Sequence, residues 1–266
     1  MQNHPKYHPN WKHPIENRAY ALDAVRFNSR FLGNIHQSLR SDKEIVLIAV
    51  SHRWVEHTCI QTTWMKANPN SAGFYRGRIH LGSDIPRGSG PIEWASPELK
   101  DDFDVIYAAV KAWGLSIKEA SRRLQAKREI VLTAVKENGE ALSLLNEEWR
   151  DDKEIVLAAV SNENNRLRAE ALGYASQNLK DDYDVVLAAV RNLASEIGEA
   201  SIRLQHDRGI ALEAVNNDGS SLKFLSGSLR DDKDVVLRAV STNGWALEYA
   251  SDRLKNDKEI VRTAIR

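Results

Sequence analysis

The chain has 266 residues, 42% of them hydrophobic, which is enough apolar surface for a folded core and excludes a compositionally disordered protein. Its 37 Lys and Arg are matched by 37 Asp and Glu, and this neutral total argues against a dedicated nucleic-acid binder, which relies on excess positive charge. The sequence contains no run of 18 apolar residues, no apolar N-terminal leader and only one cysteine, Cys59, so we expect neither a membrane span nor an internal disulfide and place the protein in the cytoplasm.

Residues 1–19 are predicted to be an N-terminal extension outside the main fold, either disordered or capping it. The stretch MQNHPKYHPNWKHP holds His4, His8 and His13 next to prolines, which is more typical of a frayed terminus than of a metal site. Residues 1–100 contain 13 Lys and Arg against 8 Asp and Glu, whereas residues 101–266 contain 24 against 29. The N-terminal third therefore differs chemically from the rest.

A ten-residue pattern recurs from Tyr20 to the end of the sequence. Its best example is Asp151–Val160 (DDKEIVLAAV), with relatives that start at 41, 101, 126, 181, 206, 231 and 256, and a shorter first copy at Tyr20–Val25. Corresponding positions are mostly 25 residues apart, which indicates tandem supersecondary units. We name these nine copies the A segments, and since they are apolar nearly all round we expect each to be a buried α-helix.

Polar residues mark both ends of the A segments. A polar residue is followed three positions later by an acid, as in Asp151 and Glu154, which predicts an N-cap and a carboxylate that favours the helix dipole. The recurring Asp-Asp pairs are thus interpreted as caps and not as catalytic acids. Four A segments are followed by glycine, which we expect to end the helix in the left-handed conformation. These glycines are Gly114, Gly139, Gly219 and Gly244.

Between successive A segments lies a second apolar pattern, the B segment. Its three main residues, such as Leu247, Ala250 and Leu254, follow i, i+3, i+7 spacing and predict one amphipathic α-helix that packs outside the A segments. The expected fold is all-α, an α-solenoid of about nine 25-residue helix–turn–helix repeats that forms a single domain over residues 20–266.

Two insertions interrupt the period. The shorter one, Asn162–Glu170, is polar and is expected to be a longer turn. The larger one, about residues 51–90, is rich in aromatic and arginine side chains, which are common interface anchors. It is therefore either a binding segment or a mere loop. The candidate partner-binding residues there are Trp54, Trp64, Phe74, Tyr75, Arg76, Arg78 and Arg87.

The same insertion leaves two further hypotheses open. His52, His57, Cys59 and His80 are zinc ligands by residue type, although their spacing matches no standard site. Its basic and aromatic side chains could also stack on nucleic-acid bases. We hold both as alternatives to protein binding.

One position within the A segments varies freely, which predicts a solvent-facing column. Such a column is either a groove that contacts a partner or an ordinary wetted face, and Glu213 and Arg238 are its candidate binding residues. The column reads Asp23, Ile48, Ala108, Thr133, Ala158, Ala188, Glu213, Arg238 and Thr263.

The stretch Asn243–Val261 (NGWALEYASDRLKNDKEIV) resembles the repeats of the domain of unknown function 4116 family, and Lys136–Val160 is similar. The resemblance extends over most of residues 92–266 and less well over 20–50, and it implies a helical repeat with no known activity, cofactor or catalytic residue. With the repetition itself, it favours a non-catalytic scaffold that binds another protein, needs no cofactor and makes no contact with membranes.

Overall fold

The computed structural model describes residues 14–27, 29–51, 90–162 and 170–265. The chain forms two compact units, unit 1 up to Ile130 and unit 2 from Val131 onward. Regular structure in the described residues is helical throughout, apart from an isolated bridge between Ile15 and Ile35. The all-α prediction is therefore confirmed.

All nine A segments are α-helices. The seven from α2 to α13 bury the same four positions, which in α8 are Ile155, Val156, Ala159 and Val160, all at most 1% exposed. The prediction of a buried A helix is thus confirmed. The nine helices in the described residues are α1 (Arg18–Phe27), α2 (Lys43–Ser51), α4 (Phe103–Ala112), α6 (Arg128–Glu137), α8 (Lys153–Val160), α10 (Tyr183–Asn192), α12 (Arg208–Asn217), α13 (Lys233–Thr242) and α15 (Lys258–Ala264).

The B segments are not single α-helices, so that prediction is wrong. Each consists of a 3₁₀ turn, a break in extended conformation, and a second short helix. In unit 1 the pairs are η1 (Ser29–Asn34) with η2 (Gln37–Ser41), η4 (Gly90–Trp94) with η5 (Leu99–Asp101), and η6 (Gly114–Glu119) with α5 (Arg122–Gln125). In unit 2 they are η7 (Gly139–Leu144) with α7 (Glu147–Arg150), η8 (Leu172–Tyr174) with α9 (Gln177–Lys180), η9 (Ala194–Glu199) with α11 (Ile202–Gln205), η10 (Gly219–Phe224) with η11 (Leu229–Asp231), and η12 (Gly244–Tyr249) with α14 (Asp252–Lys255).

A serine or asparagine causes the break in most B segments. The Ser201 hydroxyl accepts a hydrogen bond from the Leu204 N–H and caps α11, while Ala200 before it is extended. Side chains of this type favour an N-cap over a helix interior because they bond to nearby backbone N–H groups. The apolar triplet is still buried, since Ile197, Ala200 and Leu204 point to the core from both sides of the break.

Where an Asp-Asp or Asn-Asp pair precedes an A helix, the N-cap is the second residue of the pair and not the first. Asp152 accepts hydrogen bonds from the N–H groups of Glu154 and Ile155, and Asp182, Asp232 and Asp257 do the same in their helices. The acid two positions after the cap lies in the first turn, where it favours the helix dipole. The predicted cap was one residue too early.

The glycines after the A helices do not adopt the left-handed conformation. Gly90 is the only described glycine with a φ in that range. At Gly219 a Cβ would lie 2.1 Å from the carbonyl oxygen of Ala239, and at Gly244 it would lie 2.1 Å from that of Ala264. The reason for glycine at these two positions is that the next A helix approaches the backbone closely, so the capping explanation was wrong.

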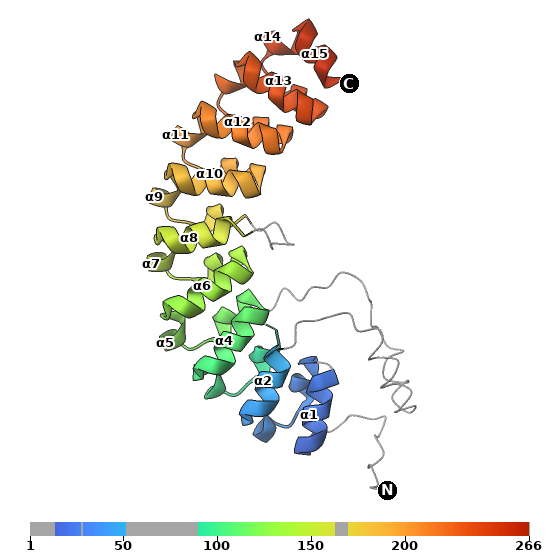
Figure 1. Cartoon of the computed structure of the whole chain (residues 1–266), viewed down its shortest axis with the longest axis vertical. Helices are drawn as coiled ribbons and strands as arrows, with labels where there is room; N and C mark the ends of the chain where they lie inside the picture. Colours follow the sequence, from blue (N-terminus) through green and yellow to red (C-terminus); the bar gives the residue numbers. More distant parts are fainter. Residues whose placement is uncertain (1–13, 28, 52–89, 163–169, 266) are drawn as a thin grey trace, which may run out of the picture. The chain divides into compact units, whose positions relative to one another are not determined.

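Consecutive A helices pack against each other within each unit, and a B segment connects them in the sequence. We define a layer as one A helix together with the B segment that precedes it. In unit 1, α2 packs on α1 and α4, and in unit 2 the sequence of neighbours is α8, α10, α12, α13 and α15 (Figure 1). Every internal layer in unit 2 is therefore covered by another layer on both sides.

None of the helices found in the described residues has the length and apolar character needed to cross a membrane.

Candidate partner surface

Basic residues at the start of the A helices bind two acids of the next layer, the capping aspartate and the acid two positions after it. Lys153 Nζ lies 2.8 Å from Asp182 Oδ2 and 2.9 Å from Asp184 Oδ2. Arg208 contacts Asp232 and Asp234 in the same way, and Lys233 contacts Asp257 and Glu259. Unit 1 repeats the arrangement with Arg18 and Lys43. The carboxylates that could have served acid–base chemistry are thus engaged in contacts between layers.

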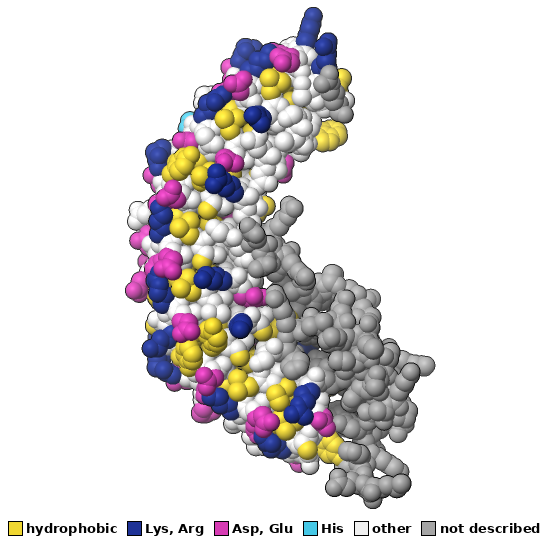
Figure 2. All heavy atoms as spheres, viewed as in Figure 1, with side chains coloured by type: hydrophobic (Ala, Val, Ile, Leu, Met, Phe, Trp, Pro, Cys, Tyr) yellow, Lys and Arg dark blue, Asp and Glu magenta, His cyan; other side chains and the backbone are white. Residues whose placement is uncertain are grey.

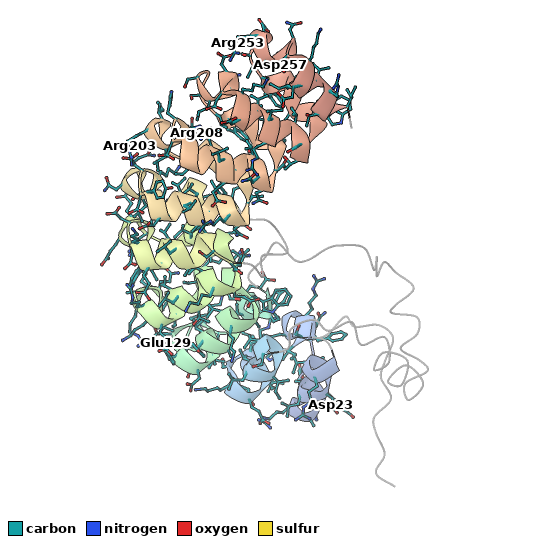
Figure 3. The ribbon with its side chains drawn as sticks, turned by 45° about the horizontal axis from the view of Figure 1, so that its top comes forward. Asp23, Glu129, Arg203, Arg208, Arg253 and Asp257 are labelled. Atoms are coloured by element: carbon teal, nitrogen blue, oxygen red, sulfur yellow. The ribbon has the colours of Figure 1, made fainter. Side chains whose placement is uncertain are left out.

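In each adjacent Asp-Asp pair, the second aspartate caps the A helix, and the first has a different partner. This partner is the serine that caps the short helix of the following B segment. Asp181 accepts hydrogen bonds from the Ser201 hydroxyl and from Arg203 Nε, and these bonds hold the pKa of the Asp181 carboxyl below its usual value. Asp101 and Asp231 repeat this with their own serine and arginine. Arg203 and Arg253, which make these contacts, lie along one edge of unit 2 in Figure 3.

Side-chain amides bind the ends of the A helices in unit 2. The Asn217 amide donates to the carbonyl oxygens of Val190 and Arg191 in the preceding layer at 2.9 and 3.0 Å, and Asn192 donates to Val160 at 2.8 Å. These carbonyls lack partners within their own helix. Among the helices that we had expected glycine to end, α6 is bound in the same way, because the Asn162 amide donates to the carbonyl oxygen of Lys136 at 2.9 Å.

Among the described residues, Glu196 is the only charged residue that is buried. It is 2% exposed, and its carboxylate accepts hydrogen bonds from the backbone N–H groups of Leu172 and Ala171 in the preceding layer. In most other repeats the N–H equivalent to that of Ala171 donates to a carbonyl one turn earlier, as Ser221 does to Asp218. Glu196 takes the place of that acceptor where the 163–169 insertion precedes Ala171.

The pKa of Glu196 is raised to about 8, mainly by burial, which outweighs the two backbone hydrogen bonds that lower it, with a smaller contribution from the nearby charges of Glu170 and Glu199. Since this pKa lies above the unfolded value near 4.5, the folded state holds the proton more tightly. The contribution of Glu196 to the free energy of unfolding must then fall as pH rises from about 4.5 to about 8, and level off above.

We expect Glu196→Gln to remove this pH dependence while keeping an amide oxygen as acceptor. Urea unfolding of both proteins should be measured between pH 5 and pH 9. The unfolding free energy of the wild type, relative to that of the variant, should decline over this range by on the order of 2–4 kcal/mol. Other titrating groups are common to both proteins and cancel in the difference. A difference that stays constant over this range would contradict the assignment.

The variable column of the A helices is only partly open to solvent. Asp23 and Arg238 are exposed, and the other seven positions are half-buried. Glu213 accepts from Arg191 Nη2 at 2.8 Å, and Arg238 Nη1 lies 3.3 Å from the side-chain oxygen of Asn216. Both candidate binding residues therefore already contact a neighbouring layer, although each remains accessible to a partner.

A second surface on unit 2, which we did not predict, lies on the 3₁₀ turns of the B segments. We call it the outer row and define it as Leu144, Tyr174, Glu199, Phe224 and Tyr249, one residue from each layer at the same position. Leu144 and Tyr174 are 42% and 39% exposed, and Phe224 and Tyr249 are half-buried.

Neighbouring residues hold the outer row in place. Gly198 leaves room for the Phe224 ring, which lies 2.9 Å from where a Cβ on Gly198 would be, and Lys223 Nζ lies 4.6 Å from the ring centroid. Lys180 pairs with Glu199 at 3.5 Å. Figure 2 shows hydrophobic side chains recurring between basic and acidic ones on the face it presents, rather than one large apolar area.

The remaining sequence-based candidates lie outside the described residues. This holds for the whole set of Trp54, Trp64, Phe74, Tyr75, Arg76, Arg78 and Arg87, for the weak metal candidates His52, His57, Cys59 and His80, for residues 1–13, and for residues 163–169. Over the residues that are described, no three His, Cys, Asp or Glu side chains come together as a metal site.

These features define an all-α protein of tandem short layers joined by recurring polar contacts. The family model described as Domain of unknown function (DUF4116) matches residues 17–55, 127–180, 182–230, 207–252 and 232–266. These matches cover more than half of the chain, which therefore belongs to this family, as its resemblance indicated. A search of curated proteins and a search of solved structures each found no match.

Proposed function

We propose that the chain is a non-catalytic helical-repeat scaffold that binds another protein. The observation that carries this proposal is the outer row, where Leu144 and Tyr174 stay substantially exposed at the same position of two consecutive layers. Aromatic side chains that present a large rigid surface with a polar tip are favoured at protein interfaces. Their placement on rigid turns also lowers the entropy that a partner must overcome on binding.

The engagement of the acidic pairs supports the same proposal. Each aspartate pair is held by a lysine, an arginine or a serine of a neighbouring segment, as Asp181 and Asp182 are by Ser201 and Lys153. These contacts explain why the pairs recur once per layer. The described residues therefore support protein binding more specifically than they support catalysis.

Photo-crosslinking in cells that make the protein tests the outer row. A photoreactive phenylalanine analogue at Tyr174 should give a discrete adduct with a second protein, and the same analogue at Gln177, an exposed position of the same layer, should not. The adduct should be lost when Leu144 is changed to Ser, because both side chains would contact the partner. Equal adducts at both positions, or none at Tyr174, would contradict the proposal for this surface.

Two further variants separate the other candidate surfaces. Deletion of residues 51–90 tests the insertion, and Glu213→Arg combined with Arg238→Glu tests the variable column. If the adduct at Tyr174 survives both changes, the outer row suffices for binding. If no partner is lost with the Leu144→Ser change, with the deletion or with the charge reversal, the scaffold proposal itself fails.

A further inference from the structure

The surface around the outer row is acidic, although the chain as a whole is neutral. Residues three apart in a 3₁₀ turn lie above one another, so the positions one and four before each row residue form an edge beside the row. The row and this edge together carry one base, Lys223, against the acids Glu140, Glu170, Glu199 and Glu248. We call them the acidic strip, whose edge residues are Glu140, Ser143, Glu170, Gly173, Ser195, Gly198, Ser220, Lys223, Trp245 and Glu248.

Row and edge form one surface because row residues pack on the edge of the preceding layer. A Glu199 carboxylate oxygen lies 3.2 Å from where a Cβ on Gly173 would be, and the Phe224 ring lies 2.9 Å from the corresponding point on Gly198. Glycine at both edge positions leaves room for this contact. Glu199 therefore lies on the residue next to Tyr174, the exposed aromatic of the preceding layer.

The negative charge of the acidic strip is not balanced by the residues that the structure describes. None of them forms an ion pair with Glu140, Glu170 or Glu248. Glu199 has one cation, Lys180, at 3.5 Å. The single base of the strip lies over an aromatic ring. The strip thus differs from the aspartate pairs, whose carboxylates are held by neighbouring layers, and it presents its acids to a partner.

Two of the acids lie next to the turn that carries Tyr174. Glu170 directly precedes this part of the chain, and Glu199 lies on Gly173 from the following layer. Both are near enough to Glu196 for their charges to raise its pKa. Tyr174 is therefore an exposed aromatic ring in a negative field, and a cation is attracted both to carboxylates and to the face of such a ring.

The charges of the acidic strip decide between occupants. Nucleic acids and anionic membranes are polyanions, which these carboxylates would repel. A second copy that met this one through the same strip would bring the same excess of acids, with one lysine to set against them. A protein segment with lysine or arginine is complementary instead, and such complementarity favours the encounter and fixes its register.

We propose that the acidic strip binds a basic segment of another protein. Apolar side chains of this segment cover Leu144 and Tyr174, and a lysine or arginine beside them binds Glu170 and Glu199. This inference rests on the proposed function, because it names the chemistry of the partner at the same surface. The two can fail separately, since a partner could bind the outer row through apolar contacts alone.

Neutralising two acids tests the charge of the partner. The photoreactive analogue at Tyr174 is combined with Glu170→Gln and Glu199→Gln, which keep the length and polarity of both side chains. The adduct yield should fall by roughly tenfold. The matched control carries Glu147→Gln and Glu148→Gln, two exposed acids of α7 that lie outside the acidic strip, and should keep the yield within about twofold.

The adduct also reports the chemistry of the partner directly. Mass spectrometry should place a lysine or arginine within about four residues of the crosslinked position, the reach of one helical turn. A synthetic peptide of that sequence should lose most of its affinity when its basic residues are replaced by alanine. Equal urea midpoints of the three proteins establish that a lower yield is not a loss of folding.

The possible failures are distinguishable. An unchanged yield in the Glu170→Gln, Glu199→Gln variant, or a crosslinked segment without basic residues, would overturn this inference and leave the proposed function standing. An adduct within the same chain, with a second copy or with nucleic acid would assign the strip to another occupant and overturn it as well. No adduct at Tyr174 in the otherwise unchanged protein would contradict both the inference and the proposed function.

Discussion

Ile155→Asp should unfold the layer of α8 and destabilise unit 2 by roughly 4 kcal/mol or more. Ile155 is completely buried, and an aspartate there would be an unpaired charge in an apolar core. The helix that carries it packs on α10, so loss of α8 extends to contacts that the neighbouring layer also needs. Urea unfolding followed by circular dichroism should show a large fall in the transition midpoint.

Ala158→Arg provides the matched control in the same helix. Ala158 lies in the variable column, and α13 already carries an exposed arginine, Arg238, at the equivalent position. The long side chain can extend its guanidinium into water while its stem covers apolar surface. We expect a change below about 1 kcal/mol, and a loss as large as that of Ile155→Asp would show that the column is not accessible.

Gly219→Ala should destabilise unit 2 by about 1–3 kcal/mol, although it adds only a methyl group. The added Cβ would lie 2.1 Å from the Ala239 carbonyl oxygen, and a backbone atom cannot move aside as a flexible side chain does. The equivalent position in η9 is Ala194, which is buried, so layers can separate enough to hold a methyl group. For this reason we expect a cost in stability and not a loss of folding.

Gly227→Ala tests whether the effect of Gly219→Ala comes from the close approach. Gly227 belongs to the same layer, and a Cβ on it would have no atom within 4 Å. Its replacement should be neutral or slightly stabilising, because alanine restricts the unfolded chain more than glycine does. Thermal unfolding of both variants measures this, and equal losses would mean that backbone freedom, not packing, explains both glycines.

The repeat, the nine A helices and their buried positions could be predicted because they depend on periodic burial. Ile155 and its counterparts recur every 25 or 30 residues in unit 2, and that signal survives errors in local structure. The triplet of the B segments gave the correct buried residues but the wrong helix. Its third member, such as Leu204, reaches the core only because Ser201 breaks the segment, and the recurring serine was a signal available in the sequence.

Contacts between layers could not be predicted from one repeat considered alone. The first aspartate of each pair had a local explanation as a cap, yet Asp181 serves Ser201 and Arg203 twenty residues away. Gly219 had a local explanation in its own conformation, but the reason lies in Ala239 of the next A helix. Glu196 was visible as the one glutamate in a column that otherwise holds serine or alanine from residue 116 onward, although the sequence did not show from which N–H groups it would accept hydrogen bonds.

Candidate binding residues were the least predictable part. Glu213 and Arg238 were chosen because their column varies, and the structure shows that variation also reflects pairing with Arg191 and Asn216. The outer row escaped detection because a single B helix would have placed Tyr174 and Phe224 among ordinary surface positions. Exposure of side chains at one position of successive layers depends on the 3₁₀ turns, which periodicity alone does not reveal.

The central claim is that a layer in unit 2 has no stability of its own and depends on the core it shares with its neighbours. Native-state hydrogen exchange on Ile155→Asp tests this directly, since it reports opening helix by helix. The account predicts that protection is lost in α8, falls strongly in α10 and is less affected in α13 and α15. Loss confined to α8, with α10 as protected as in the wild type, would show that layers fold independently and would contradict the account.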